Sequence, residues 1–345
     1  MIGKSDAETI LTLFNVYDPP RAIHCLEESG QGDNYRGIFR IETFSSDLVC
    51  KICGEKVCPK WLIEQQVRFS NLLYQNGVPV AKSLGSNSSS CINIQLKESK
   101  CKYNVSLEKY LGSDLIHADL STFRTFGKLI GQMHRISQAH SAKIGISYTA
   151  SALKSNKASF ARIMEKSNPT FTNESLVNRL AFMHDELITE LIKKWETLPA
   201  GAVHGDLGIY NNLTQTENGL GIIDFNRAGD EVFLGDALST FYASIHKLSW
   251  QERLASIPQN QALYAFFSGY NSERKLNKIE TKIYPLIAAL FDGLFYCKNA
   301  IELWNIGAQS EALERMQMGE SHFDSILHPY PIPELKRCNY DNSTN

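Results

Sequence analysis

The segment from residue 203 to residue 236 constrains the fold of this 345-residue chain more than any other. It reads as the end of a strand, a polar loop, a second strand, a turn with the Asn-Gly pair of a tight hairpin, and a third strand. Its loops and strand ends carry three acids and an amide, namely Asp206, Asn211, Asp224 and Asp236. Because a tight hairpin brings the outer ends of its strands together, we expect Asn211 and Asp224 to converge.

The residue types of this segment suit transfer of a phosphoryl group. Asp206 lies in a tight loop after the apolar pair 202–203, where a carboxylate can accept the proton of a substrate hydroxyl. Asn211 and Asp224 supply the hard oxygen ligands that Mg²⁺ prefers together with phosphate oxygens and water. Local turn chemistry is the alternative for an isolated Asp-Asn-Asp set, but it leaves the His-Gly-Asp triplet and the hairpin unexplained.

Two further residues of the segment are expected to support it rather than to react. His204 would orient the loop that carries Asp206. Asp236 follows Gly235 at the start of a helix, where it would accept backbone N–H groups and brace the same loop.

Composition argues for a soluble protein with a small-molecule partner. The formal net charge is −2 and 43% of the residues are hydrophobic, which supports a sizeable core and gives no field to hold nucleic acid or an anionic membrane. The first residues lack the apolar core of a signal peptide, and the longest apolar run, 284–297, is broken by Asp292 and too short to span a bilayer. Eight scattered cysteines fit reduced thiols, so we predict a cytoplasmic protein.

The first hundred residues have the pattern of a sheet. Strands are expected at 38–41 and 47–53, after a loop that contains Gly30 and Gly32. Backbone N–H groups of such a loop can approach phosphates because glycine has no side chain to hold a ligand away, although an ordinary surface turn is the alternative.

A lysine inside the second of these strands needs an explanation. Lys51 lies among apolar residues, where it requires either a partner or a position that faces solvent. Glu64 is the only acid of the helix expected over 59–76, so it is either that partner or a solvated helix residue. After another pair of strands at 92–96 and 103–107, the pattern becomes mainly helical. The chain is therefore predicted to be α+β.

Taken together, these features resemble the aminoglycoside phosphotransferase and choline kinase superfamily, which shares the protein-kinase-like fold. Within it, the layout is similar to type II homoserine kinases and related small-molecule kinases. The residues of the central segment that carry the resemblance are His204-Gly205-Asp206, Asn211, Ile223-Asp224-Phe225 and Asp236. Many relatives have His-Pro-Gly before the asparagine where this chain has Gly208-Ile209-Tyr210, and their helix glutamate often occupies the position of Gln66.

The resemblance implies two lobes joined by a hinge. Residues 1–106 would form an antiparallel-sheet nucleotide-binding lobe, residues 107–112 the hinge, and residues 113–345 a mainly helical lobe with the catalytic loop and the substrate site. ATP and Mg²⁺ would be the cofactors.

The resemblance also implies roles for individual residues. Asp206 would be the catalytic base, and Asn211 and Asp224 the magnesium ligands. Lys51, paired with Glu64, would contact the first two phosphates of ATP. The linker backbone, which includes Glu108, Tyr110 and Leu111, would meet adenine.

The expected reaction is transfer of the γ-phosphate of ATP to a hydroxyl of a small polar metabolite, such as an amino alcohol or a hydroxy amino acid. An antibiotic phosphotransferase of the aminoglycoside type is one alternative, although its polycationic substrate would need more carboxylates than this mildly acidic chain suggests. A protein kinase or an inactive kinase-like binding module is another. Asp292, in the apolar stretch 286–295, is a candidate contact to a substrate amine, or else a helix residue that faces solvent.

Overall fold

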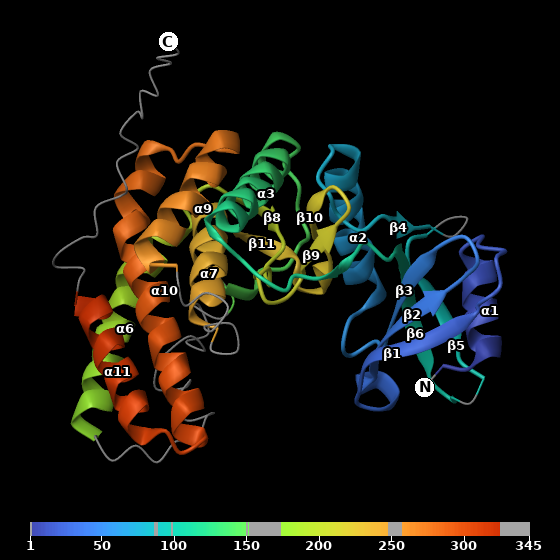
Figure 1. Ribbon diagram of the computed structural model, residues 1–345, viewed down its shortest axis with the longest axis horizontal. Helices are drawn as coiled ribbons and strands as arrows, with labels where there is room; N and C mark the ends of the chain where they lie inside the picture. The colour runs from blue at the N-terminus through green and yellow to red at the C-terminus, as the bar shows by residue number, and fades with distance from the viewer. Residues whose placement is uncertain are drawn as a thin grey trace, which may run out of the picture.

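The computed structural model confirms the predicted α+β architecture (Figure 1), with an antiparallel sheet in the N-terminal part and mostly helices in the C-terminal part. The structure describes residues 2–85, 89–97, 99–149, 151, 174–247 and 257–324. None of the helices in these ranges has both the length and the apolar character needed to cross a membrane.

The N-terminal part is built on one six-stranded antiparallel sheet in the order β1-β2-β3-β6-β4, with β5 also paired to β6. Its strands are β1 (Ala22–Ser29), β2 (Arg36–Glu42), β3 (Asp47–Cys53), β4 (Ser83–Leu84), β5 (Ile92–Gln95) and β6 (Lys102–Lys109). Helix α1 (Lys4–Leu13) covers one face, where its Ile10 and Leu11 join a core with Phe39 and Ile52.

The register of the sheet decides which way Lys51 points. Lys51 is opposite Ile38 in β2 and Ser106 in β6. Side chains alternate between the two faces of a strand, so Lys51 faces away from the α1 core to which its neighbours Cys50 and Ile52 belong. That other face is turned toward the C-terminal part of the chain.

Helix α2 (Lys60–Gln75) lies between the sheet and the C-terminal part (Figure 1). It ends at Gln75 and is followed by Gly77, whose φ of +79° belongs to the left-handed region that glycine adopts after helix ends. Phe69 packs edge-on against Phe225 of the C-terminal part, with ring centroids 5.9 Å apart. The helix therefore connects the two parts through side-chain packing as well as through the chain.

The C-terminal part contains long helices around short strands. The described helices are α3 (Leu120–Ala139), α6 (Glu174–Trp195), α7 (Phe233–His246), α9 (Gln259–Glu273), α10 (Lys278–Asn305) and α11 (Gln309–Asp324). The strands are β7 (Ser113–Asp114), β8 (Ala200–Val203), β9 (Leu213–Thr216), β10 (Gly219–Ile222) and β11 (Gly229–Val232). The predicted hairpin is confirmed, since β9 and β10 pair with Gly219 opposite Thr216.

The expected hinge begins inside the sheet. Residues 107–109 are the end of β6, where Lys109 is paired with Leu48, and residues 110–112 lead from β6 to β7. The division into two lobes with a hinge at 107–112 stays a prediction.

Candidate active site

The loop between β8 and β9 holds Asp206 through two neighbouring residues. The buried His204 donates from Nε2 to the carbonyl oxygen of Ile223 at 2.8 Å, which leaves Nδ1 to accept from the Asp206 N–H at 3.4 Å. Gly205 has a φ of +78°, and a Cβ there would lie 2.4 Å from the carbonyl oxygen of Arg227. Glycine is therefore needed where the loop meets the segment after β10.

Asp206 stands at the edge of a cavity of about 280 Å³ in the C-terminal part. Burial of its carboxyl group raises its pKa above the ordinary 3.8, although the nearby guanidinium of Arg227 acts in the opposite direction. A carboxylate with a raised pKa is a stronger base than an ordinary aspartate.

The side chains of Asn211 and Asn212 both form hydrogen bonds with the backbone of this loop. Their side-chain amides donate to the carbonyl oxygen of Asp206 at 3.3 and 2.9 Å, respectively. The Oδ1 atom of Asn211 is buried without a hydrogen-bond partner in the described part of the chain, and a Cβ at Gly208 would lie 2.7 Å from it. An unpartnered buried oxygen is costly, so its position fits a cation that would use it as a ligand.

Asp224 meets Lys51 across the two parts of the molecule. It follows β10 with a φ of +62°, which is uncommon for a residue with a side chain and often marks a functional position. Its Oδ1 atom lies 3.1 Å from Nζ of Lys51, and its Oδ2 atom lies 3.8 Å from Nη2 of Arg36. Burial alone would raise the pKa of Asp224, but the Lys51 ammonium holds it below the ordinary value.

The second partner of Lys51 is Glu108 at the end of β6. Nζ of Lys51 lies 3.0 Å from Oε1 of Glu108, and both side chains are largely buried. Burial works against the charge of Lys51, yet the two carboxylates raise its pKa above the ordinary value. Lys51 therefore remains an ammonium group held between Glu108 and Asp224.

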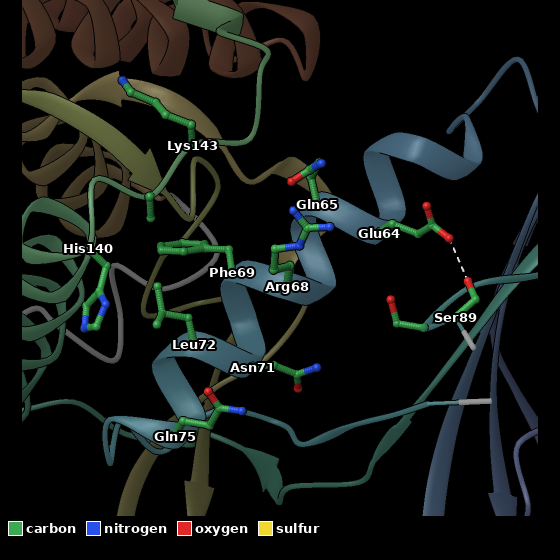
Figure 2. Close-up of a pocket in the computed structure, with 12 residues that line it drawn as sticks. Glu64, Gln65, Arg68, Phe69, Asn71, Leu72, Gln75, Ser89, His140 and Lys143 are labelled. Atoms are coloured by element: carbon green, nitrogen blue, oxygen red, sulfur yellow. Dashed lines mark hydrogen bonds between the residues drawn. The ribbon is translucent and has the colours of Figure 1, made fainter. Parts of the chain in front are cut away.

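The structure does not bring Glu64 to Lys51, which corrects the predicted pairing. Glu64 points from α2 toward Ser89 (Figure 2), whose hydroxyl donates to it at 2.6 Å, and it lies 3.8 Å from Nζ of Lys60. This face of α2 borders a different cavity, lined in part by Arg68 and Leu72. Glu64 thus belongs to the surface of α2 and not to the site around Asp224.

Gln66 is the α2 residue that reaches the site. Its buried amide donates to the carbonyl oxygens of Asn226 at 2.9 Å and of Ala228 at 3.3 Å. These two carbonyls belong to the segment that follows Asp224. The position that holds a glutamate in many relatives therefore fixes the Asp224 segment here instead of pairing with Lys51.

The glycine loop and the linker have well-defined local geometry. Gly30 and Gly32 have φ angles of +68° and +55°, and a Cβ at Gly30 would lie 2.1 Å from the carbonyl oxygen of Asn34. The glycines are thus required by the turn itself. In the linker, the backbone N–H of Tyr110 donates to the carbonyl oxygen of Asp47 at 2.9 Å. The side chain of Leu111 packs against Gly221 so closely that a Cβ at Gly221 would touch it. Phosphate binding by the loop and adenine binding by the linker stay predictions.

A model of the family described as "Phosphotransferase enzyme family" matches residues 32–266. The chain belongs to this phosphotransferase family. No curated protein matches it in sequence.

Solved structures of small-molecule kinases share the fold of this phosphotransferase. An amicoumacin kinase in complex with AMP-PNP, Ca²⁺ and Ami is 14% identical, with a TM-score of 0.63 and 92% of each chain covered. A microcompartment-associated aminopropanol kinase is 16% identical, with a TM-score of 0.64 over 94% of this chain and 97% of its own. A putative aminoglycoside phosphotransferase from Ralstonia eutropha is 14% identical, with a TM-score of 0.56 over 96% and 100%. The protein-kinase-like architecture predicted from the sequence is thus confirmed.

Asp236 braces the phosphotransferase in a different way from the one predicted. Its Oδ2 atom accepts from Nε2 of the buried His134 in α3 at 3.0 Å. Nδ1 of His134 in turn accepts from the Tyr270 hydroxyl at 3.0 Å, and Arg274 donates to that hydroxyl at 2.9 Å. Asp236 therefore joins α7 to α3 and α9, and the residue also lines the cavity at Asp206.

Asp292 is not available to a substrate amine in this phosphotransferase. It is 1% exposed, so the alternative that it faces solvent is also wrong. Its carboxylate accepts from His246 at 2.6 Å and Gln259 at 2.9 Å, and it lies 3.0 Å from Nδ1 of His322. Burial alone would raise the pKa of Asp292, but hydrogen bonds from the two histidines hold it low. Asp292 is a structural residue that joins α7, α9, α10 and α11.

Sequence reasoning missed the contact between the Glu108 side chain and Lys51, and it missed Glu231 altogether. Glu231 lies in β11 and lines the cavity beside Asp206. Both residues are acids within strands, where an acid is unusual unless it faces solvent or a partner. That signal is present in the sequence, but it does not say which face of the strand becomes buried.

Proposed function

We propose that this phosphotransferase moves the γ-phosphate of ATP to a hydroxyl group of a small polar metabolite, an amino alcohol or a hydroxy amino acid. One observation carries most of the proposal. A single loop holds Asp206 at the edge of a cavity. The same loop carries Asn211, whose amide donates to the backbone of Asp206 and whose buried Oδ1 atom has no partner in the described ranges. A base beside an acceptor cavity and an open cation ligand are two of the parts that recur in enzymes of phosphoryl transfer.

Asn211 and Asp224 would hold Mg²⁺. The open Oδ1 atom of Asn211 and the carboxylate of Asp224 match the oxygen ligands that this ion takes. The positive charge of bound Mg²⁺ would offset the negative charge of the ATP phosphates. The complex of the related amicoumacin kinase with AMP-PNP and Ca²⁺ supports a nucleotide and a divalent cation here as well.

The residues of the chain would divide the remaining work. Lys51, held between Glu108 and Asp224, would contact the first two phosphates. Asp206 would accept the hydroxyl proton as the acceptor oxygen bonds to the γ-phosphorus and the bond from that phosphorus to the β-γ bridging oxygen breaks. ADP would leave with that bridging oxygen. The raised pKa of Asp206 favours this proton transfer.

The size of the cavity favours a metabolite over an antibiotic. At about 280 Å³ it lies at the lower end of the roughly 300–1,000 Å³ of pockets that enclose drug-sized ligands. The similar fold of an aminopropanol kinase is consistent with a small acceptor.

An ATP-dependent enzyme with free cysteines in the described part of the chain also fits the proposed cytoplasmic location.

An acceptor screen tests the proposal. The protein is incubated with ATP, Mg²⁺ and, in turn, ethanolamine, aminopropanol, homoserine, a sugar and an aminoglycoside, and release of ADP is measured against a blank without acceptor. We expect acceptor-dependent ADP release with a small amino alcohol or hydroxy amino acid. Nucleotide binding without release of ADP for any acceptor would instead indicate a binding module.

A further inference from the structure

Glu231 lines the same cavity as Asp206 and has a carboxylate oxygen without a partner in the described ranges. The residue is only 6% exposed. Its Oε1 atom accepts from the Thr149 N–H at 2.8 Å and from the Ser147 hydroxyl at 3.1 Å, and these two bonds fix the orientation of the carboxyl group. Its Oε2 atom is buried and has no hydrogen-bond partner in the described ranges.

A buried carboxylate with one open oxygen is unfavourable unless something binds it. Leaving such a group unpaired costs free energy because protein atoms replace the water that would solvate the charge. Burial raises the pKa of Glu231, while the bonds from Thr149 and Ser147 oppose that rise. Since Glu231 lines the cavity that also contains Asp206, a ligand in that cavity can reach it.

The walls of this cavity favour a positively charged ligand. Glu231, Asp206 and Asp236 contribute three carboxyl groups, whereas Lys298 is the only cationic side chain among the described residues that line it. Nζ of Lys298 lies 4.7 Å from the ring centroid of Phe295, and no contact between Lys298 and Glu231 is present in the described structure.

Aromatic side chains complete the cavity. Trp195 packs so closely on Gly235 that a Cβ there would lie 2.4 Å from its ring, and Trp195 also lines the cavity. Aromatic faces attract ammonium groups, and such attraction is stronger where water is excluded. The carboxyl groups and the aromatic side chains therefore favour the same kind of ligand.

We infer that Glu231 binds the ammonium group of the phosphate acceptor and thereby selects small alcohols that carry a primary amine. The inference rests on the proposed function, because it assumes that the acceptor hydroxyl lies at Asp206. It assigns to Glu231 the role that the sequence suggested for Asp292. The acceptor is then a short molecule with its ammonium group at Glu231 and its hydroxyl at the base.

Glu231 is a better choice than the other acids of the region. Asp236 already accepts from His134, and Asp292 has three protein partners. Asp206 must remain free for the hydroxyl proton. Glu231 is the carboxylate that combines deep burial, a fixed orientation and an open oxygen.

The test compares matched acceptors in the wild-type protein and in Glu231→Gln. Glutamine keeps the shape of the side chain and an oxygen for Thr149 and Ser147, but it removes the charge. Values of kcat/KM are measured for aminopropanol and its counterpart without the amine, propanediol, and for homoserine and hydroxybutyrate. Asp230→Asn is the control, because it removes the same charge from the neighbouring residue of β11, whose carboxylate accepts from the backbone of Ile144 and Gly145 instead.

We expect the wild-type protein to prefer each amine over its counterpart, and Glu231→Gln to lose roughly 10- to 100-fold in kcat/KM for the amines only. Asp230→Asn should keep the preference. If aminopropanol and homoserine are both phosphorylated, their shared ammonium group determines recognition. If only one of them is phosphorylated, the enzyme also recognises the rest of the acceptor, and Glu231→Gln should still lower kcat/KM for that acceptor.

Two results would overturn the inference while leaving the proposed function intact. One is transfer to amines and to their counterparts at equal rates. The other is an unchanged amine preference in Glu231→Gln, with normal ATP affinity and thermal unfolding that show a folded variant. By contrast, absence of transfer to every acceptor in the wild-type protein would count against the proposed function itself, and calorimetric binding of aminopropanol to the ATP-free protein, compared between wild type and Glu231→Gln, would still test Glu231.

Discussion

Glu231 and Asp292 are both deeply buried acids of the helical part, yet they differ in what their oxygens meet. Asp292 has protein partners from three other helices or their flanks, and two of these are histidines. Glu231 has partners on one oxygen only; its other oxygen has no partner in the described ranges, and the residue lines the cavity that Asp206 also lines. Burial alone therefore does not identify a ligand-binding acid. The number of partners that the protein itself supplies separates a structural acid from one that is available to a ligand.

The largest expected effect is on Asp206, the proposed base, which lines the same cavity. Asp206→Asn should lower kcat by roughly 10²- to 10⁴-fold, because an amide cannot accept the hydroxyl proton. ATP affinity and the unfolding midpoint should stay close to wild type, since the Asp206 carboxylate has no hydrogen-bond partner that the fold needs among the described contacts. Steady-state kinetics and denaturant titration check both parts. Turnover within a few-fold of wild type would remove Asp206 from the proposed role.

The same chemical change at the two buried acids should have opposite outcomes. Asp292→Asn should lower the free energy of unfolding by about 3 kcal/mol, because it leaves His246 and His322 without a charged partner. Glu231→Gln should leave the free energy of unfolding unchanged or raise it, because it removes a charge that the protein pairs incompletely. Urea unfolding of both variants makes the comparison, and a loss of stability in Glu231→Gln as large as that in Asp292→Asn would contradict it.

A smaller effect is expected at the Lys51 site, where two glutamates can be compared. Glu108→Gln should raise the KM for ATP about 10-fold, because Lys51 would lose a charged partner at 3.0 Å and be drawn toward Asp224. Glu64→Gln is the matched control on α2 and should change that KM by less than about two-fold, as expected for an exposed ion pair. Equal effects of the two variants would contradict the assignment of Glu108, rather than Glu64, as the acid that positions Lys51.

The smallest effect is a difference in acid sensitivity between the two regions. Burial raises the pKa of Asp206, and a base works only when ionised, so kcat/KM should fall as pH drops through a value above 3.8. Hydrogen bonds depress the pKa of Asp292 in the folded state, so its contribution to stability is complete above its unfolded-state value of about 3.8 and is lost only below it. Activity should therefore decline at a higher pH than the Asp292 contribution to stability. Coincident loss of both in pH profiles would contradict this order.

The sequence was a good guide where function depends on local chain geometry. The Asn-Gly turn predicted the β9–β10 hairpin, and the His-Gly-Asp triplet identified the loop in which His204 and Gly205 hold Asp206. These features depend on residues that are close along the chain, so short-range rules suffice. The change from a sheet-rich N-terminal part to a mainly helical C-terminal part could be predicted from the sequence for the same reason.

The sequence failed where a side chain is paired by distant elements. Glu108 reaches Lys51 because of the register between β3 and β6, and Glu64 leaves it because α2 turns that face toward Ser89. The carboxylate of Asp292 is bound by residues of three other helices. The sequence pattern of 286–295 does not show that these partners exist. Glu231 was missed because its burial depends on the segment around Thr149.

The most direct test of the central claim is to follow the phosphate itself. Wild-type protein and Asp206→Asn are each incubated with ATP, Mg²⁺ and the best acceptor of the screen, and phosphorus NMR identifies where the γ-phosphate goes. We expect a phosphate ester on the acceptor hydroxyl, formed in step with ADP by the wild-type protein and strongly reduced in Asp206→Asn. Release of inorganic phosphate alone, or ester formation at equal rates by the two proteins, would contradict it.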